Sequence, residues 1–248
     1  MILAIDIGNA HTKIGFFRRK TLARSTTLPS VPPPTMQSIR RKLVPPRGGE
    51  LEGAVISSVV PALTKRYAAA IQEKYGLQPL IVSGKMNVGI AIHYKHPSKL
   101  GPDRICAAVA AYKRFGGPVI IVDFGTATTY GVIMKNGEFL GGAISAGIRT
   151  SANALARGTA KLPAVSLSFP DHPVGKTTVR NIQSGILFGA LDAVEGMVKR
   201  LKSIAGRGTT VIATGGFAKL VASRTNIFDA VVPDLVLEGA HLIYERTR

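Results

Sequence analysis

The sequence predicts an α/β protein built from two similar halves, and two observations carry this prediction. Short apolar segments rich in β-branched residues alternate along the chain with longer segments of helical periodicity. In addition, LAIDIGNAHTKIGFF near the N-terminus aligns without gaps with IIVDFGTATTYGVIM in the middle, which places Asp6 over Asp123 at an offset of 117 residues. The alternation gives the fold class, and the repeat gives the two halves.

Each copy of the repeat is predicted to be a β-hairpin with a phosphate-binding tip. An apolar run ends in aspartate, a turn of small residues follows, and a second apolar run begins. Glycine in such a turn allows close backbone approach, and successive N–H groups and hydroxyls there form a concavity suited to phosphate. Either aspartate alone could simply close its turn through its side chain, but the repetition favours a functional role.

The remaining elements follow in chain order. Strands are expected at 53–60, 79–83 and 210–216, and helices at 62–75, 103–115, 179–205 and 236–246. Residues 26–49 contain six prolines and are expected to form a surface excursion without a chemical role. The sequence RFGGP at 114–118 suggests a boundary, so we expect one domain at 1–115 and a second at 116–248.

The composition limits the partners and chemistry that we expect for this protein. A formal net charge of +18 would suit nucleic acid, an anionic membrane or acidic small molecules, but the basic clusters are short and lack the aromatic residues that single-strand binders use. We therefore expect neither nucleic acid nor a membrane as partner. The single cysteine, Cys106, lies in an apolar helix and is expected to be buried rather than nucleophilic. With no leader or long apolar run, the protein is expected to be cytoplasmic.

The segment LGPDRICAAVAAYKRFGG, from Leu100 to Gly117, carries one aspartate at the start of an apolar helix. Asp103 could be the N-cap of that helix or a catalytic carboxylate, and the segment alone leaves both readings open. The exposed N–H groups and the helix dipole at this position lead us to expect an ionised carboxylate without a raised pKa.

The motifs taken together resemble a known family. Paired DIGN and DFGT hairpins with ATGG near the C-terminus resemble the acetate and sugar kinase, heat-shock chaperone and actin superfamily. Along nearly its whole length the chain also resembles type III pantothenate kinases, through VISSVVP, GPDR, DFGTATT, TAKLP, SGILFG and DLVLEGAHLIYER in that order. The resemblance implies two ribonuclease-H-like (actin-like ATPase) domains with a cleft between them, the adenosine motif lying in the second.

That family transfers the γ-phosphoryl group of ATP to the primary hydroxyl of pantothenate, the first step of coenzyme A synthesis. The resemblance implies Mg²⁺ near Asp6, a monovalent cation, K⁺ or NH₄⁺, at Asp123, and Asp103 as the catalytic base. It implies contacts to ATP from Asp6, Gly8, Asn9, Ala10, His11, Thr12, Lys13 and Thr126, and to pantothenate from Tyr94, Gly101, Pro102, Asp103, Arg104 and Thr178. Because Thr178 lies at a subunit interface in that family, a homodimer is also implied.

Two other functions remain as alternatives. One is a catalytically inactive regulatory relative that binds nucleic acid or a transcription complex, supported by the net charge and by Gly131, which stands where the family has an acidic residue. The other is a different small-molecule kinase of the same superfamily. The presence of all three aspartates, Asp6, Asp103 and Asp123, favours the kinase over the inactive relative. Taken singly, Tyr94 could be an ordinary strand aromatic and Lys13 a solvated surface residue.

Overall fold

The computed structural model describes residues 1–46 and 49–248, which group into two compact units. Unit 1 comprises Met1–Arg114 together with Asp234–Arg248, and unit 2 comprises Phe115–Pro233. The sequence placed the last segment in the second half, whereas in the structure the chain returns to unit 1 for its final helix. Its apolar face is buried against the sheet of unit 1, a long-range contact that no local pattern reveals.

Unit 1 is built on a five-stranded sheet in the order β3-β2-β1-β4-β5. β1, β2 and β3 are antiparallel neighbours, while β4 runs parallel to β1 and β5 parallel to β4. The bounds are β1 Ile2–Ile7, β2 His11–Arg18, β3 Thr21–Pro29, β4 Gly53–Ser58 and β5 Leu80–Ile81. A two-residue strand β6 (Ala91–Ile92) and a single 3-10 turn (Pro97–Lys99) follow.

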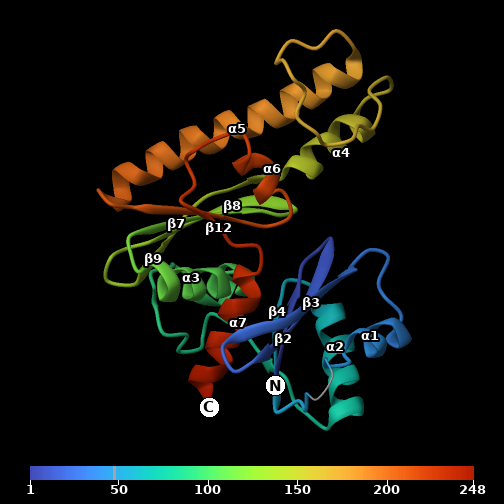
Figure 1. Cartoon of the computed structure of the whole chain (residues 1–248), viewed down its shortest axis with the longest axis vertical. Helices are drawn as coiled ribbons and strands as arrows, with labels where there is room; N and C mark the ends of the chain where they lie inside the picture. The colour runs from blue at the N-terminus through green and yellow to red at the C-terminus, as the bar shows by residue number, and fades with distance from the viewer. Residues whose placement is uncertain (47–48) are drawn as a thin grey trace. The chain divides into compact units, whose positions relative to one another are not determined.

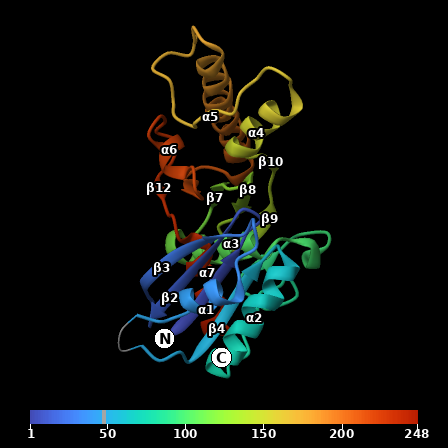
Figure 2. The same ribbon diagram turned by 90° about the vertical axis from the view of Figure 1, so that its right-hand side faces the viewer.

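Helices cover both faces of this sheet. α1 (Met36–Lys42) and α2 (Pro61–Tyr75) lie on one face, over a core of aliphatic residues from β1, β2 and β4 (Figure 2). α3 (Pro102–Phe115) and α7 (Leu235–Thr247) lie side by side on the other (Figure 1). They pack so closely that a Cβ atom on Gly239 would lie 1.8 Å from the Cys106 carbonyl oxygen, so only glycine fits there.

The proline-rich segment is more ordered than the sequence predicted. Its first residues complete β3, which pairs with β2 as far as Pro29. α1 follows, and its Ile39 and Leu43 are fully buried in the core of unit 1. Prolines flank these elements without interrupting them, so the expectation of a surface excursion was wrong for 26–29 and 36–43. Positions 47 and 48 of the segment lie outside the described residues.

Unit 2 repeats the topology of unit 1. Its sheet has the order β9-β8-β7-β11-β12, with the same strand directions as β3-β2-β1-β4-β5. The short strand β10 also pairs with β8, but it is not one of these five strands. The bounds are β7 Val119–Phe124, β8 Ala127–Ile133, β9 Glu138–Gly141, β10 Ile144–Ala146, β11 Thr210–Thr214 and β12 Ala230–Val231. The duplication predicted from the two hairpins is therefore confirmed at the level of whole sheets.

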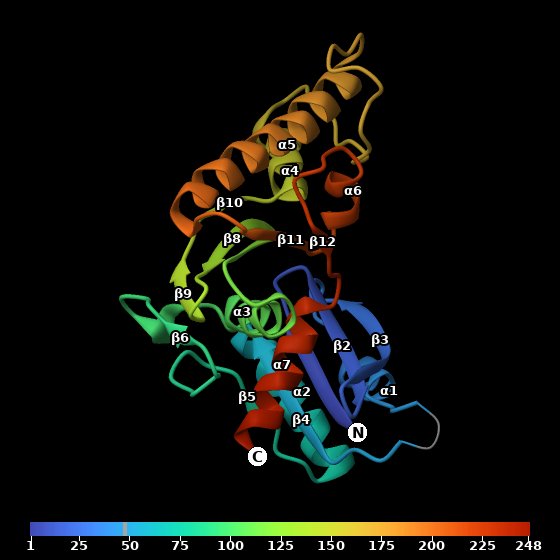
Figure 3. The same cartoon turned by 60° about the vertical axis from the view of Figure 1, so that its left-hand side comes forward.

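The helices of unit 2 are α4 (Ile148–Gly158), α5 (Thr178–Ala205) and α6 (Ala218–Ala222). α5 is 28 residues long, and its part from Leu187 onward lies along one face of the sheet (Figure 3), where Leu187, Val194 and Val198 are buried against β7, β8 and β11. The segment between α4 and α5, residues 159–177, contains no helix or strand. No helix in the described part of the chain is both long and apolar enough to span a bilayer.

Candidate functional site

The tip of the first hairpin joins β1 to β2 in unit 1. The Gly8 N–H donates to the His11 carbonyl at 3.0 Å and closes the turn, while Asn9, Ala10 and His11 are exposed. A side chain at position 8 would crowd the His11 carbonyl, since its Cβ would lie 3.1 Å from that oxygen. The tip thus offers bare backbone to a ligand, as a phosphate loop requires.

The second hairpin joins β7 to β8 in unit 2 and has a shorter tip. Asp123 pairs with Thr129 across the strands, whereas Asp6 pairs with Lys13, so the first tip is one residue longer. The ungapped alignment of the two repeats therefore fails after the turn, and Thr12 corresponds to Thr128 rather than to Thr129. Both of these threonines are buried.

The corrected register also explains the glycine that departs from the family pattern. Gly131 on β8 occupies the position that Gly15 occupies on β2. A Cβ at either site would approach a packed side chain, Phe139 at 3.1 Å for Gly131 and Leu237 at 2.9 Å for Gly15. Gly131 thus shares its position and its close packing with Gly15 of the first half of this chain.

The Asp123 carboxylate lies against the ATGG turn that follows β11. Thr214 is its parallel partner, and Gly215 has a φ of +89°, a conformation that favours glycine. A Cβ on Gly215 would lie 2.4 Å from Asp123 Oδ1, so the backbone comes as close to this carboxylate as glycine allows. The next residue, Gly216, faces open space.

The start of α4 is tied to the second tip. The Thr126 carbonyl accepts hydrogen bonds from the Gly147 N–H at 3.1 Å and from Thr150 Oγ1 at 2.6 Å. The Thr126 side chain remains exposed. In unit 2 the hairpin, the ATGG turn and the N-terminal turn of α4 therefore converge on one edge of the sheet.

In unit 1 two of the three aspartates are brought near a single buried thiol. Ser57 on β4 donates its hydroxyl to Asp6 Oδ1 at 3.3 Å, and Cys106 on α3 is fully buried beside this pair. Burial raises the pKa of the Cys106 thiol well above its usual value, and the negative charges of Asp6 and Asp103 raise it further. Cys106 is therefore a neutral, buried thiol, as the sequence indicated, and it marks Asp6 and Asp103 as neighbours.

Asp103 is a first-turn residue of α3 and not its N-cap, because the helix begins at Pro102. Its Oδ1 accepts a hydrogen bond from the Arg104 N–H at 2.8 Å. A Cβ atom on Gly101 would lie only 2.4 Å from this oxygen. The glycine of GPDR thus makes room for the carboxylate. Burial raises the pKa of Asp103 above its usual value, and the Arg104 N–H and guanidinium offset this only in part. The expectation of an unraised pKa was wrong because packing around α3 outweighs the helix terminus.

Two further residues of the first hairpin face opposite sides of the sheet. Lys13 forms an ion pair with Asp234, which precedes α7, at 3.1 Å between Nζ and Oδ1, and both side chains are about one-third exposed or less. It lies on the same face as its cross-strand partner Asp6. Thr12 points the other way and is fully buried, so its hydroxyl serves the core and only its backbone is left for a ligand.

The remaining predicted residues are accessible. In unit 1, Tyr94 is half-buried and lies between β6 and the 3-10 turn, and the neighbouring His93 and His96 are exposed. In unit 2, Thr178 is the exposed first residue of α5, whose N-cap is Thr177. Among the described residues no three histidine, cysteine or acidic side chains are placed to hold a metal ion.

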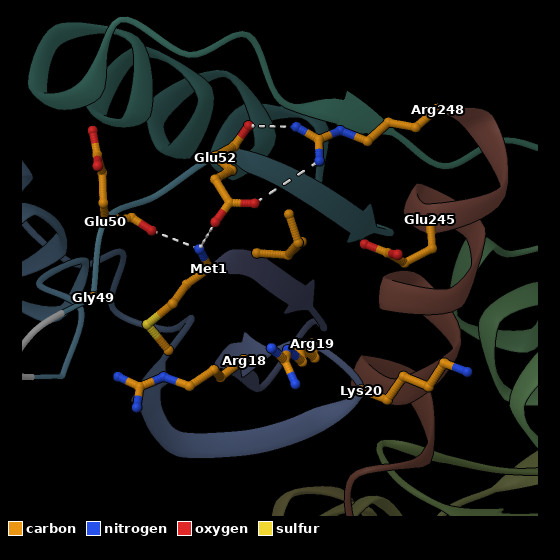
Figure 4. A pocket seen from close by; sticks show the side chains of 10 residues that line it. Met1, Arg18, Arg19, Lys20, Gly49, Glu50, Glu52, Glu245 and Arg248 are labelled. Atoms are coloured by element: carbon orange, nitrogen blue, oxygen red, sulfur yellow. Dashed lines mark hydrogen bonds and ion pairs between the residues drawn. The ribbon is translucent and has the colours of Figure 1, made fainter.

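A pocket elsewhere in unit 1 contains none of the predicted residues (Figure 4). The amino group of Met1 donates to the Glu50 carbonyl at 2.6 Å and to Glu52 Oε1 at 2.8 Å, and the Arg248 side chain reaches the Glu52 carbonyl at 3.1 Å. The N-terminal amine holds the pKa of Glu52 below its usual value. These contacts along the wall of the pocket fasten the two chain ends of unit 1 to the residues before β4.

Comparison with known proteins identifies the family. A family model described as type III pantothenate kinase matches residues 2–200. The type III pantothenate kinase of Moorella thermoacetica is 40% identical over 252 residues, which cover 99% of each chain, and that of Roseiflexus sp. is 41% identical over the full length of both. The chain belongs to the type III pantothenate kinase family.

Solved structures show the same fold in more distant proteins. The polyphosphate/ATP-glucomannokinase of Arthrobacter sp. superposes with a TM-score of 0.55 at 13% identity, and covers 100% of this chain and 99% of its own. The ROK family glucokinase of Streptomyces griseus, solved with glucose and AMPPNP, gives 0.54 at 15% identity and covers 98% and 99%. The fold is thus the two-domain actin-like ATPase fold that the paired hairpins predicted.

Proposed function

We propose that this protein phosphorylates pantothenate with ATP, the first step of coenzyme A synthesis, and that Asp103 is its catalytic base. Membership of the type III pantothenate kinase family over the whole length of the chain is the observation that carries the proposal. In the reaction the primary hydroxyl of pantothenate forms a bond to the γ-phosphorus, the bond to the bridging oxygen of ADP breaks, and Asp103 accepts the hydroxyl proton.

The residues present fit ATP and its metal ion. Both hairpin tips present exposed backbone around a glycine, which suits the polyphosphate chain. Asp6 offers carboxylate oxygen, and Mg²⁺ typically takes one or two carboxylates with substrate phosphates completing its shell. When bound, Mg²⁺ would neutralise charge on the phosphates. Ser57 would hold the Asp6 carboxylate in place through its hydroxyl.

Asp103 is suited to its role by its surroundings. Burial raises its pKa, which makes the carboxylate a stronger proton acceptor. The Arg104 N–H holds one carboxylate oxygen, Oδ1, and Gly101 leaves room for it. We assign the Arg104 guanidinium, with Tyr94, to the recognition of pantothenate, whose carboxylate an arginine fork can grip.

We further propose that Asp123 holds a monovalent cation, K⁺ or NH₄⁺. Its carboxylate supplies only oxygen, the donor type that replaces the hydration shell of K⁺, and the turn at Gly215 brings backbone close to it. A working homodimer, with Thr178 contributing to the pocket of the partner subunit, and a cytoplasmic location complete the proposal.

The experiment is ADP release from ATP, with and without pantothenate, in K⁺ and in Na⁺ buffers, for the wild type and Asp123→Asn. We expect pantothenate-dependent turnover that K⁺ stimulates in the wild type and that K⁺ and Na⁺ support equally in the variant. Turnover that is indifferent to the cation in the wild type would remove the cation from the proposal. A folded wild type without turnover, combined with salt-dependent binding to random DNA, would instead favour the regulatory relative.

A further inference from the structure

The tip of the first hairpin rests on a buried pair of hydroxyl groups on the side of the sheet away from Asp6. Thr12 Oγ1 and Ser30 Oγ are 3.0 Å apart, and the two residues are 0% and 3% exposed. Ser30 is the first residue after β3, whose ladder with β2 ends at the His11–Pro29 pair. Ser30 therefore lies directly beneath the tip.

Ser30 holds the tip by two bonds at once. Its N–H donates to the Ala10 carbonyl at 2.9 Å, and its hydroxyl meets Thr12, the first residue of β2 that is buried. Together with the turn-closing bond from Gly8 and the pairing of His11 with Pro29, these contacts hold the exposed residues of the tip. A shift of Ser30 would move the Ala10 carbonyl and, with it, the neighbouring N–H groups.

Tyr67 of α2 closes this arrangement from below. Its side chain is fully buried against the same core, and its hydroxyl, which lies beside Thr12, makes no hydrogen bond of normal geometry with the described residues. Burial raises the pKa of Tyr67, so its proton stays on the oxygen and is available to Thr12. Three hydroxyls in an otherwise apolar core are costly to bury, and apolar side chains of the same shape would fill the space without that cost.

The tip of the second hairpin is held by backbone contacts at the corresponding place. There the Thr126 carbonyl accepts the N–H of Gly147, and β10 pairs directly with the tip through Ala146 and Ala127. In unit 1 the end of β3 takes the place of β10, since Pro29 pairs with His11, and the Ser30 N–H supplies the corresponding backbone bond to the Ala10 carbonyl. The hydroxyl contact between Ser30 and Thr12 adds to this backbone support in unit 1.

We infer that Ser30, anchored by Thr12, is a positioning residue that sets the first phosphate hairpin in the geometry that binds the ATP phosphates. The inference rests on the proposed function in that it takes this hairpin as an ATP site. It assigns no contact between Ser30 and ATP, because Ser30 acts through Ala10.

The test compares Ser30→Ala and Thr12→Val, which each remove one hydroxyl of the pair, with Thr12→Ser, which keeps it. We expect the first two to raise KM for ATP about five- to tenfold, since a buried hydrogen bond of this kind is worth roughly a factor of that size. KM for pantothenate and kcat should stay within about twofold, and Thr12→Ser should restore KM for ATP.

Thr209→Val is the matched control for lost stability. Thr209 is also buried, and its hydroxyl donates to the Gly206 carbonyl at 2.6 Å, but it lies before β11 in unit 2, at the end of that strand away from the ATGG turn. The Thr209→Val variant should lower the melting temperature by about as much as Thr12→Val does, and it should leave KM for ATP unchanged. If Ser30→Ala and Thr12→Val lower the melting temperature but leave KM for ATP within twofold of wild type, the pair is only structural and the inference is overturned.

Binding of ADP, measured by calorimetry, separates this inference from the proposed function. If the wild type binds ADP but does not phosphorylate pantothenate, the proposed reaction fails. The inference still holds if Ser30→Ala and Thr12→Val weaken ADP five- to tenfold while Thr209→Val does not. Equal ADP affinity in all four proteins would overturn it whatever the reaction.

Discussion

Replacing Asp103 by asparagine should lower activity and raise stability at the same time. Asparagine keeps an oxygen that can accept the Arg104 N–H at 2.8 Å and has nearly the same shape, so it fits over Gly101 as aspartate does. What it loses is the negative charge and the ability to accept a proton from the substrate hydroxyl. Because a positioned base contributes roughly 10²- to 10⁴-fold, we expect kcat to fall by at least about 10²-fold with small changes in KM.

The stability change follows from the direction of the pKa shift. The pKa of Asp103 is raised in the folded protein, so the folded state binds this proton more tightly than the unfolded state. The charged carboxylate therefore costs folding free energy above the unfolded pKa, and the cost grows until the pH passes the raised folded pKa. Each tenfold increase in proton affinity corresponds to about 1.4 kcal/mol, or roughly 3–6 °C in melting temperature for a chain of this size.

The measurement is the melting temperature of wild type and Asp103→Asn from pH 7 down to pH 3, beside steady-state kinetics at pH 7.5. We expect the variant to melt higher at neutral pH and the difference to vanish as the pH falls below the unfolded pKa. Asp192→Asn, on an exposed part of α5, removes the same charge and should change neither quantity. An Asp103→Asn protein that keeps wild-type kcat, or that melts lower than wild type at pH 7, would refute the reasoning.

Two further predictions concern the glycine turn of unit 2 and the buried thiol. Gly215→Ala should destabilise the protein by about 2 kcal/mol or more and weaken ATP binding, because its φ is +89° and its Cβ would lie 2.4 Å from Asp123 Oδ1. Gly216→Ala, which meets nothing within 4 Å, should be near neutral in the same denaturation and binding assays, and equal effects at both positions would contradict the steric argument. Cys106 should not react with a thiol reagent at pH 8 while the protein is folded, and should react fully in guanidinium, because it is buried and its pKa is raised. Rapid labelling of the native protein would show that the helix packing over Cys106 is open.

The sequence predicted those features that depend on residues close together along the chain. Both hairpins, their glycine tips and the start of α3 follow from short motifs whose spacing is local, and all appear where the motifs are. The structure alone explains why GPDR contains glycine: Gly101 leaves room for the Asp103 carboxylate. The residue type was visible in the sequence, but the contact it permits was not.

What the sequence could not predict depends on contacts between distant segments. α7 follows unit 2 in the chain, yet it packs on the sheet of unit 1, where His241 stacks on Phe17 with ring centroids 4.4 Å apart. The raised pKa of Asp103 likewise comes from packing around it and not from its place in the helix. Ser30 was missed because it stands among prolines and its two partners, Ala10 in the hairpin tip and Thr12 on β2, lie about 20 residues away in the chain.

The two halves also show how one duplicated hairpin can serve two tasks. Asp6 and Asp123 occupy the same place, and each is paired with a hydroxyl residue on the next parallel strand, Ser57 and Thr214. The difference lies one residue further on, where Ser58 follows in unit 1 and Gly215 in unit 2. Gly215 lets backbone approach the Asp123 carboxylate where any side chain would collide with it, whereas in unit 1 the carboxylate is held by the Ser57 hydroxyl instead. A carboxylate set among backbone groups suits a weakly held monovalent cation, and one oriented by a single hydroxyl beside a bare turn suits Mg²⁺ on a phosphate chain. The neighbouring strand, and not the hairpin itself, thus accounts for the different roles we propose for the two aspartates.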